Sequence, residues 1–115
     1  MIKVTYTYDK DKRECALTVN GHAGQAEIGK DIICASASIL AYAIAQVVKA
    51  MESHGDLIEP PTLDLGSGDT TIKCRAKDDY LFAELMQYFF VVKTGYVLLA
   101  HNYPQFVELI TDDKA

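Results

Sequence analysis

A histidine and a cysteine lie at the two ends of a glycine-bearing segment. His22 follows Gly21 at the expected end of a strand, and Cys34 lies twelve residues further on, near the start of an expected helix. A thiolate is the nucleophile of cysteine hydrolases, and a nearby imidazole assists it as a base or as the imidazolium of an ion pair. The two residue types therefore predict covalent catalysis by a Cys–His pair, provided that the loop between them folds back.

The expected position of Cys34 in its helix supports this interpretation. Asp31 is a good N-cap candidate, which would make Cys34 the third residue of the helix. At that position the helix dipole and free backbone N–H groups favour a negatively charged sulfur. Cys34 and Ser38 are four residues apart, so they share a helix face, which Tyr42 continues. Because the apolar stripe lies largely on the opposite face, we expect Cys34 at a surface or in a cleft.

Each of these residues also has a purely structural interpretation. Cysteine is among the residue types most often buried, so Cys34 also fits a core thiol. A histidine at a strand end is often a surface or hydrogen-bonded residue. Asp31 fits a cap with no catalytic role, and Ser38 fits a hydroxyl bonded to the carbonyl one turn back. The spacing alone leaves both interpretations open.

The composition excludes several classes of protein. The 115 residues fit one domain, spanning 1–115, and half of them are apolar, which argues against disorder. The formal net charge of −5 argues against a dedicated nucleic-acid binder. Three cysteines are too few, and odd in number, for a disulfide scaffold. No Cys or His residues have zinc-ligand spacing, so we expect no metal, and Cys15 and Cys74 fall in strand patterns typical of core thiols.

The longest apolar stretch, Ile32 to Met51, raises the question of a membrane span. It contains Ser36, Ser38, Gln46 and Lys49 and is rich in Ala, which favours a half-buried helix. The first residues alternate like a strand and do not resemble a secretory signal. We therefore expect a cytoplasmic protein that does not interact with a membrane.

Two hairpins are predicted from alternating apolar and polar residues. Residues 2–8 and 15–19 alternate on either side of a short polar link, and residues 62–65 and 70–76 do so around the turn at residues 66–69. Residues 106–111 fit one further strand at the end of the chain.

Two long helices are predicted from three- and four-residue spacings. The first starts after Asp31 and ends near His54, and its apolar stripe consists of Ile33, Ala37, Leu40, Ile44, Val47 and Met51. The second follows Asp78 or Asp79 and ends at Tyr103-Pro104. Its expected apolar face consists of Leu81, Leu85, Tyr88, Val92, Tyr96 and Leu99. The order predicts an α+β fold, with an antiparallel or mixed sheet from two hairpins packed against two helices.

The region around these candidates resembles the signature of the ribosomal-processing cysteine protease family, Prp. The resemblance is carried by Gly21-His22-Ala23, by Gly29-Lys30-Asp31-Ile32-Ile33-Cys34-Ala35 and by Ser38. The Gly-His pair and the Gly-x-Asp-x-x-Cys run, with a Ser four residues beyond, are fairly specific together. Chain length and order of elements extend the resemblance to nearly the whole sequence.

The resemblance implies a small bacterial cysteine endopeptidase with a Cys–His dyad. Cys34 is then the nucleophile and His22 its partner, and Gly21, Asp31 and Ser38 match supporting or substrate-binding positions. The implied substrate is the N-terminal extension of a large-subunit ribosomal protein. The family also implies a homodimer, a loop between His and Cys that substrate orders, and no cofactor, metal or nucleic acid.

One departure from the family pattern leaves the substrate open. After Cys-Ala the family usually has Ala, a larger aliphatic residue and Ser, whereas this chain has Ser36, Ala37 and Ser38. Two alternatives follow: a phage-encoded relative that processes a capsid or scaffold precursor, and a non-catalytic assembly or binding module on the same fold. The acidic net charge favours a basic protein substrate.

Overall fold

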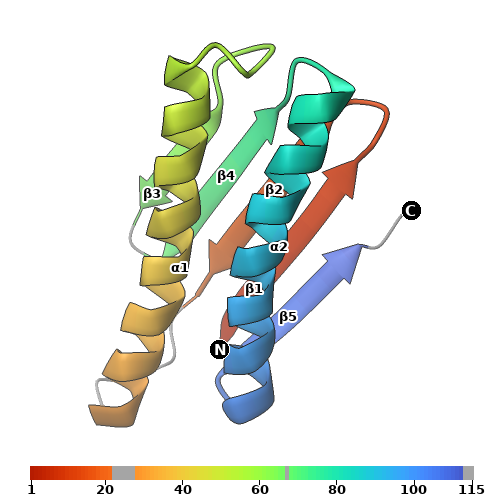
Figure 1. Ribbon diagram of the computed structural model, residues 1–115. Coiled ribbons are helices and arrows are strands. Elements are labelled where there is room, and N and C mark those ends of the chain that lie inside the picture. The colour runs from red at the N-terminus through yellow and green to blue at the C-terminus, as the bar shows by residue number, and fades with distance from the viewer. Residues whose placement is uncertain (22–27, 67, 113–115) are drawn as a thin grey trace.

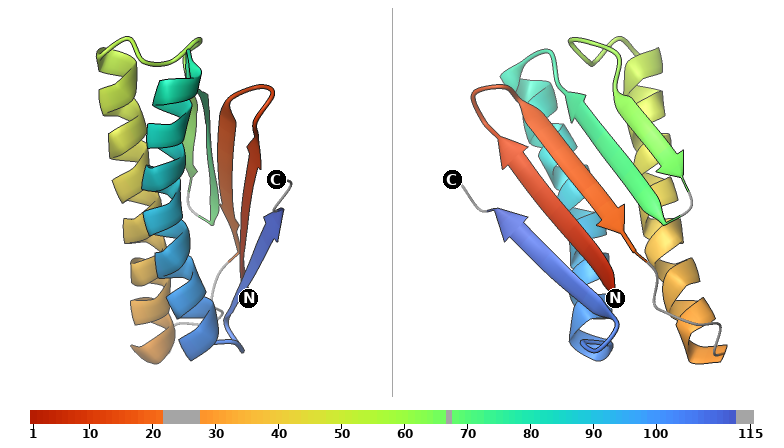
Figure 2. Two further views of the ribbon diagram at one scale, coloured as in Figure 1. Left: turned by 45° about the vertical axis from the view of Figure 1, so that its right-hand side comes forward. Right: turned by 180° about the vertical axis from the view of Figure 1, so that it is seen from behind.

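The computed structural model describes residues 1–21, 28–66 and 68–112, and these residues form two layers. Along the chain the elements are β1 Ile2–Asp9, β2 Glu14–Asn20, α1 Ile28–Ser53, β3 Thr62–Gly66, β4 Asp69–Arg75, α2 Asp79–Asn102 and β5 Val107–Asp112. The two helices lie side by side over one face of the sheet (Figure 1). The view from behind shows that the other face is not covered by a helix (Figure 2). The predicted α+β fold is confirmed.

The described strands form one mixed sheet in the order β3-β4-β2-β1-β5. The hairpins β1–β2 and β3–β4 are antiparallel, and they are joined by antiparallel pairing of β2 with β4. The final strand, β5, pairs in parallel with β1. Parallel strands cannot be joined by a tight turn. The helix α2 returns the chain to the end of the sheet where β1 begins, so that β5 can run parallel to β1.

The core lies between the sheet and the helices. Alternate residues of each strand face the helices, so Val4 and Tyr6 of β1 and Leu17 of β2 are buried while their neighbours in sequence face the open side. From α1 the buried residues are Ile33, Ala37, Ala41, Ile44, Ala45, Val48 and Met51. The predicted stripe is thus largely confirmed, with Leu40 and Val47 packed at its border.

The predicted inner face of α2 is partly wrong. Its buried residues are Phe82, Leu85, Phe89, Val92 and Tyr96, at alternating three- and four-residue steps. Tyr88, which was expected inside, is exposed and donates a hydrogen bond from its hydroxyl to Glu84. The apolar run of residues 88–92 fits more than one helical register, and the register that buries a phenyl ring leaves the polar phenol in water.

The helix α1 contains a 22-residue stretch, Ile32–Ser53, that is long and apolar enough to cross a membrane. In this fold its buried residues pack against the sheet and α2 as part of the core. Core packing thus accounts for the buried stripe of α1, whereas Ile32, Ile39 and Tyr42 are exposed.

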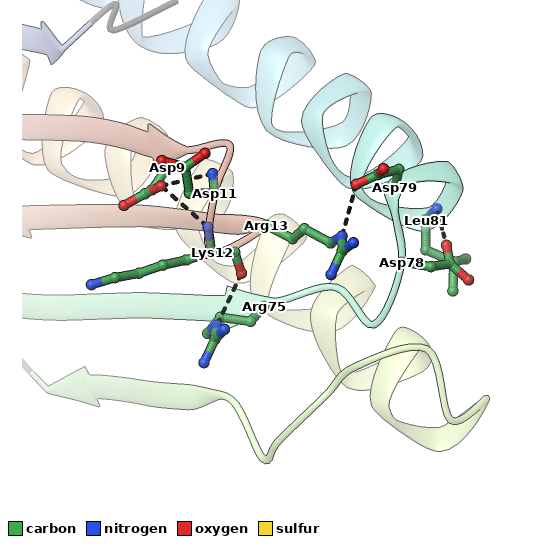
Figure 3. Close-up of polar contacts among 8 residues, drawn as sticks. All are labelled: Asp9, Asp11, Lys12, Arg13, Arg75, Asp78, Asp79 and Leu81. Atoms are coloured by element: carbon green, nitrogen blue, oxygen red, sulfur yellow. Dashed lines mark hydrogen bonds and ion pairs between the residues drawn. The ribbon is translucent and has the colours of Figure 1, made fainter.

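The end of the molecule that holds the β1–β2 turn is stabilised by polar contacts (Figure 3). Asp78 caps α2 by accepting the Leu81 N–H at 2.8 Å, and the Arg13 guanidinium lies 2.8 Å from the neighbouring Asp79 carboxylate. The Arg75 guanidinium donates to the Lys12 carbonyl at 2.9 Å. These contacts hold the β1–β2 turn against the start of α2 and leave the opposite end of the sheet for the candidate site.

A glycine of α2 lies where the side chain of Leu40 on α1 packs against it. A Cβ atom at Gly95 of α2 would lie 2.7 Å from a methyl carbon of Leu40 on α1. The adjacent residue, Tyr96, is fully buried and donates a hydrogen bond of 2.8 Å from its hydroxyl to the Ala37 carbonyl. This contact fixes α1 against α2 one turn beyond Cys34.

Candidate active site

The helix that carries Cys34 begins earlier than predicted. It starts at Ile28, so Asp31 is its fourth residue and not its N-cap, and Cys34 is its seventh. No proline interrupts residues 28–31, and a single glycine near a helix end costs only about 1 kcal/mol, so the helix extends a further turn. The dipole effect falls off within the first turn, and it therefore does not carry the activation of Cys34.

Cys34 nevertheless lies at a cleft, as its helix face predicts. It is half-buried and lines a cavity of about 320 Å³ between α1 and one end of the sheet, together with Ser38 and Tyr42. From the sheet the lining residues are Ile2, Val19, Gly21, Leu65, Gly66, Gly68 and Thr70. The thiol is thus accessible from a space of the size that ligand sites have.

The other two cysteines belong to the core. Cys15 and Cys74 are register partners on β2 and β4, and both are buried. Burial raises the pKa of each thiol to about 12, because the apolar surroundings disfavour the thiolate. A thiol with so high a pKa is a poor nucleophile at neutral pH. The prediction that both are core thiols is confirmed.

Gly21 fixes the end of β2 at the edge of this cleft. Its φ of 94° is in the left-handed region, and its N–H donates to the Gly68 carbonyl at 2.8 Å. An added Cβ atom would overlap the Met1 carbonyl oxygen. Gly21 therefore ties β1, β2 and the β3–β4 turn together where the chain continues to His22. His22 itself lies outside the described residues, as does the side chain of Asp31.

Two serines near Cys34 differ in how their hydroxyls are used. The Ser36 hydroxyl donates to the Ile32 carbonyl at 2.8 Å, which is the common behaviour of a helical serine. Ser38 is exposed and lines the cleft, and its hydroxyl has no hydrogen bond to the described part of the chain. The hydroxyl of Ser38 is therefore available to a bound ligand.

Apart from Gly21, the sheet side of the cleft was not predicted. Leu65, Gly66 and Gly68 are at or beside the β3–β4 turn, which the sequence shows only as a tight turn. Ile2 and Val19 reach the cleft because β1 begins where β2 ends. Only strand pairing brings these residues to Cys34, and no local pattern reports it.

A second cavity, of about 330 Å³, lies at the other end of the sheet beside Glu14, Glu59, Lys73 and Arg75. Its charges pair with each other, since Lys73 lies 3.7 Å from Glu14 and Arg75 lies 2.9 Å from Glu59. Its one sulfur belongs to buried Cys74. Within residues 1–21, 28–66 and 68–112, no three His, Cys, Asp or Glu side chains gather as a metal site. The Cys34 cleft is thus the candidate for catalysis.

Solved structures share this fold. The structure of SMU.848 from Streptococcus mutans is 27% identical, with a TM-score of 0.64 over 97% of this chain and 96% of that chain. The essential ribosomal processing protease Prp from S. aureus, with a covalently linked product peptide, is 21% identical, with a TM-score of 0.69 over 97% of this chain and 100% of that chain. The same S. aureus protease with a substrate peptide gives 21% identity, the same coverage and a TM-score of 0.66.

Sequence comparison identifies the family. No protein with a curated description matches this chain. The family model described as cysteine protease Prp matches residues 1–108, which include His22, Cys34 and the whole of the cleft. The chain therefore belongs to the cysteine protease Prp family and is a cysteine protease.

Proposed function

We propose that this protein is a ribosomal-processing endopeptidase that removes the N-terminal extension of a large-subunit ribosomal protein. Family membership and the shared fold with the S. aureus processing protease support this substrate class. A ribosomal precursor as substrate places the enzyme in the cytoplasm, and the acidic net charge of −5 favours a basic substrate.

The observation that carries the proposal is the position of Cys34. Of the three thiols, Cys34 lines a cleft, whereas Cys15 and Cys74 are buried and their pKa values are raised by desolvation. A cysteine protease needs an accessible sulfur. Cys34 is therefore the proposed nucleophile.

The proposed reaction uses His22 as the partner of Cys34. The Cys34 sulfur attacks the scissile carbonyl carbon, and the imidazolium of His22 gives its proton to the leaving amine, so that a thioester and the mature N-terminus form. A water molecule, deprotonated by His22, then attacks the thioester and releases the extension as a carboxylic acid. The sulfur leaves as thiolate and recovers the starting state.

The oxyanion of this reaction needs hydrogen-bond donors from outside the start of α1. As the seventh helical residue, Cys34 has its own N–H directed to the carbonyl four residues back. The Ser38 hydroxyl, which has no hydrogen bond to the described residues and lies one turn along the same face, is the proposed donor to the oxyanion or to the substrate backbone. Gly21, at the end of β2, and Asp31, near the start of α1, are proposed as supporting or substrate-binding residues.

A homodimer is proposed to form through the outer face of α2. This face exposes Phe90, Val91, Val97 and Leu98, more apolar surface than a solvent-facing helix normally carries. Light scattering of the purified protein should give the dimer mass, and Val91→Glu, which places a charge on this exposed face, should give the monomer. A Val91→Glu variant that remains dimeric would place the interface elsewhere.

The test of the function is cleavage of a purified ribosomal-protein precursor. The wild-type enzyme should release the N-terminal extension, seen as one new N-terminus by mass spectrometry, and Cys34→Ala should release none. Ser36→Ala is the matched control, because Ser36 lies two residues away with its hydroxyl bonded within the helix. An intact precursor after incubation with wild type would contradict the proposed substrate, and cleavage by Cys34→Ala would contradict the proposed nucleophile.

A further inference from the structure

We propose that the substrate peptide binds as an added strand along the free edge of β3, and that this edge leads its scissile bond to Cys34. The inference rests on the proposed function and adds how the substrate is held. It concerns the backbone groups of Leu63 and Leu65 on β3 and the Cys34, Ser38 and Tyr42 side chains on α1.

The first step is that β3 has an unpaired edge. It is the outermost strand of the sheet, and it pairs only with β4 among the described strands. In Figure 2 its outer side meets no other strand. An open edge presents backbone donors and acceptors to an incoming chain.

Hydrogen bonds elsewhere in the sheet show which β3 groups face this edge. The Gly21 N–H donates to the Gly68 carbonyl, and the Ala76 N–H donates to the Arg13 carbonyl. Consecutive residues of a strand turn their backbone groups to opposite neighbours, so the even-numbered residues of β4 bond to β2. The odd-numbered Arg75 is consistent with this pattern, because its carbonyl accepts a hydrogen bond from the Ile58 N–H, on the side of β4 away from β2.

The odd-numbered residues of β4 therefore bond to β3. Their register partners on β3 are Thr62, Asp64 and Gly66, which use their backbone groups inside the sheet. It follows that Leu63 and Leu65 direct both N–H and C=O outward. No hydrogen bond to these groups is found within the described residues.

The second step is that the edge opens into the Cys34 cleft. Leu65 and Gly66, at the end of β3, line the cleft opposite Ser38 and Tyr42. On α1 the contacts with α2 are made by Ala37 and Leu40, and residues 34, 38 and 42 form the stripe on the other side of the buried face. This stripe and the Gly66 end of the β3 edge therefore line one trough, which is the Cys34 cleft.

An extended peptide is the occupant that fits this trough. Pairing with Leu63 and Leu65 would hold its backbone, and every second side chain would point toward α1, where Tyr42 offers an apolar ring. Strand addition also presents the scissile carbonyl at a fixed distance along the chain from the paired residues. A folded protein cannot enter in this way, whereas an unstructured N-terminal extension can.

Amide hydrogen exchange by NMR tests the inference on the Cys34→Ala protein. The probe is a synthetic peptide that spans the cleavage site of the ribosomal precursor. In the complex, exchange at Leu63 and Leu65 should slow by about tenfold or more, while Asp64, already bonded to β4, should change little. Shifts at Ser38 and Tyr42 report that the peptide is bound.

The outcomes separate this inference from the function it rests on. If wild type cleaves the peptide and the Ser38 signal shifts, but Leu63 and Leu65 exchange as fast as before, strand addition is wrong and the proposed function stands. If wild type does not cleave the peptide, both fail. A second experiment uses substrate peptides that are N-methylated at one position each, which removes a single backbone donor. Strand addition predicts that KM rises only when the methyl group is at alternate positions. An equal rise in KM at every position would contradict strand addition.

Discussion

The hydroxyl of Tyr96 donates a hydrogen bond of 2.8 Å to the backbone carbonyl of Ala37, between two helices that are far apart in sequence. Ala37 lines the Cys34 cleft, so this contact reaches the wall of the candidate site from the core. Burial raises the pKa of Tyr96, which keeps the phenol protonated and donating throughout the neutral range. The position of the nucleophile is thus linked to α2 and not only to the sheet.

Replacing Tyr96 by Phe should lower the free energy of unfolding by about 1 kcal/mol, the usual loss for one buried hydrogen bond. Urea denaturation measures the change. Tyr88→Phe is the matched control, because the Tyr88 hydroxyl bonds Glu84 on the exposed side of the same helix. Equal effects of the two substitutions would contradict a stabilising role for the contact with Ala37.

Gly21→Ala should abolish cleavage and destabilise the fold. The new methyl group would overlap the Met1 carbonyl oxygen, and the left-handed φ of 94° adds strain of about 1 to 2 kcal/mol. Gly55→Ala controls for that strain, because Gly55 has a φ of 75° and open space around its added Cβ. Thermal unfolding and the cleavage assay should show that only Gly21→Ala loses activity. Full activity of Gly21→Ala would show that the end of β2 need not be fixed.

Stability should fall in alkali, and the two core thiols contribute to the decline from pH 9 upward. The pKa values of Cys15 and Cys74 rise from 9.0 to about 12 in the fold, mainly through burial. Above pH 9 the unfolded chain releases these protons while the native state keeps them, so the stabilisation is complete below pH 9 and is lost toward pH 12. Each thiol should contribute a decline of about 1.4 kcal/mol per pH unit in this window.

Urea denaturation at a series of pH values from 8 to about 11 measures this decline. Cys74→Ala should remove one thiol's share of the slope. An identical slope in wild type and Cys74→Ala would show that burial of these thiols does not govern the alkaline limit.

Alkylation should distinguish the three cysteines directly. Iodoacetamide added to the native protein at neutral pH should modify Cys34 alone, since Cys15 and Cys74 are buried. After unfolding in guanidinium chloride all three should react. Peptide mapping by mass spectrometry gives the sites, and modification of native Cys15 or Cys74 at the rate of Cys34 would contradict the core assignment.

The sequence predicts the fold well where one face of an element is apolar and the other polar. Alternation in β1 and β2 and the stripe of α1 give the first hairpin and the first helix, because burial on one face selects a single register. In α2 the aromatic run around Tyr88 and Phe89 is apolar on several sides, so only packing against the sheet decides which ring is buried.

One wall of the candidate site can likewise be predicted from the sequence, and the other cannot. Residues four apart on one helix give the row of Cys34, Ser38 and Tyr42. The start of α1 at Ile28 was not predicted. Asp31 is a residue type that often caps helices, but here it is the fourth residue of the helix. The opposite wall, with Val19 and Thr70, depends on pairing between β2 and β4, which are far apart in sequence, and local patterns do not contain this pairing.

The most direct test of the central claim is the mass of the enzyme during turnover. Wild-type protein mixed with the substrate peptide and quenched in acid should gain the mass of the N-terminal fragment less one water, as a thioester on the peptide that contains Cys34. Cys34→Ala should gain nothing and leave the substrate intact. Cleavage by Cys34→Ala, or an acyl fragment attached to another residue, would contradict the assignment of Cys34 as the nucleophile.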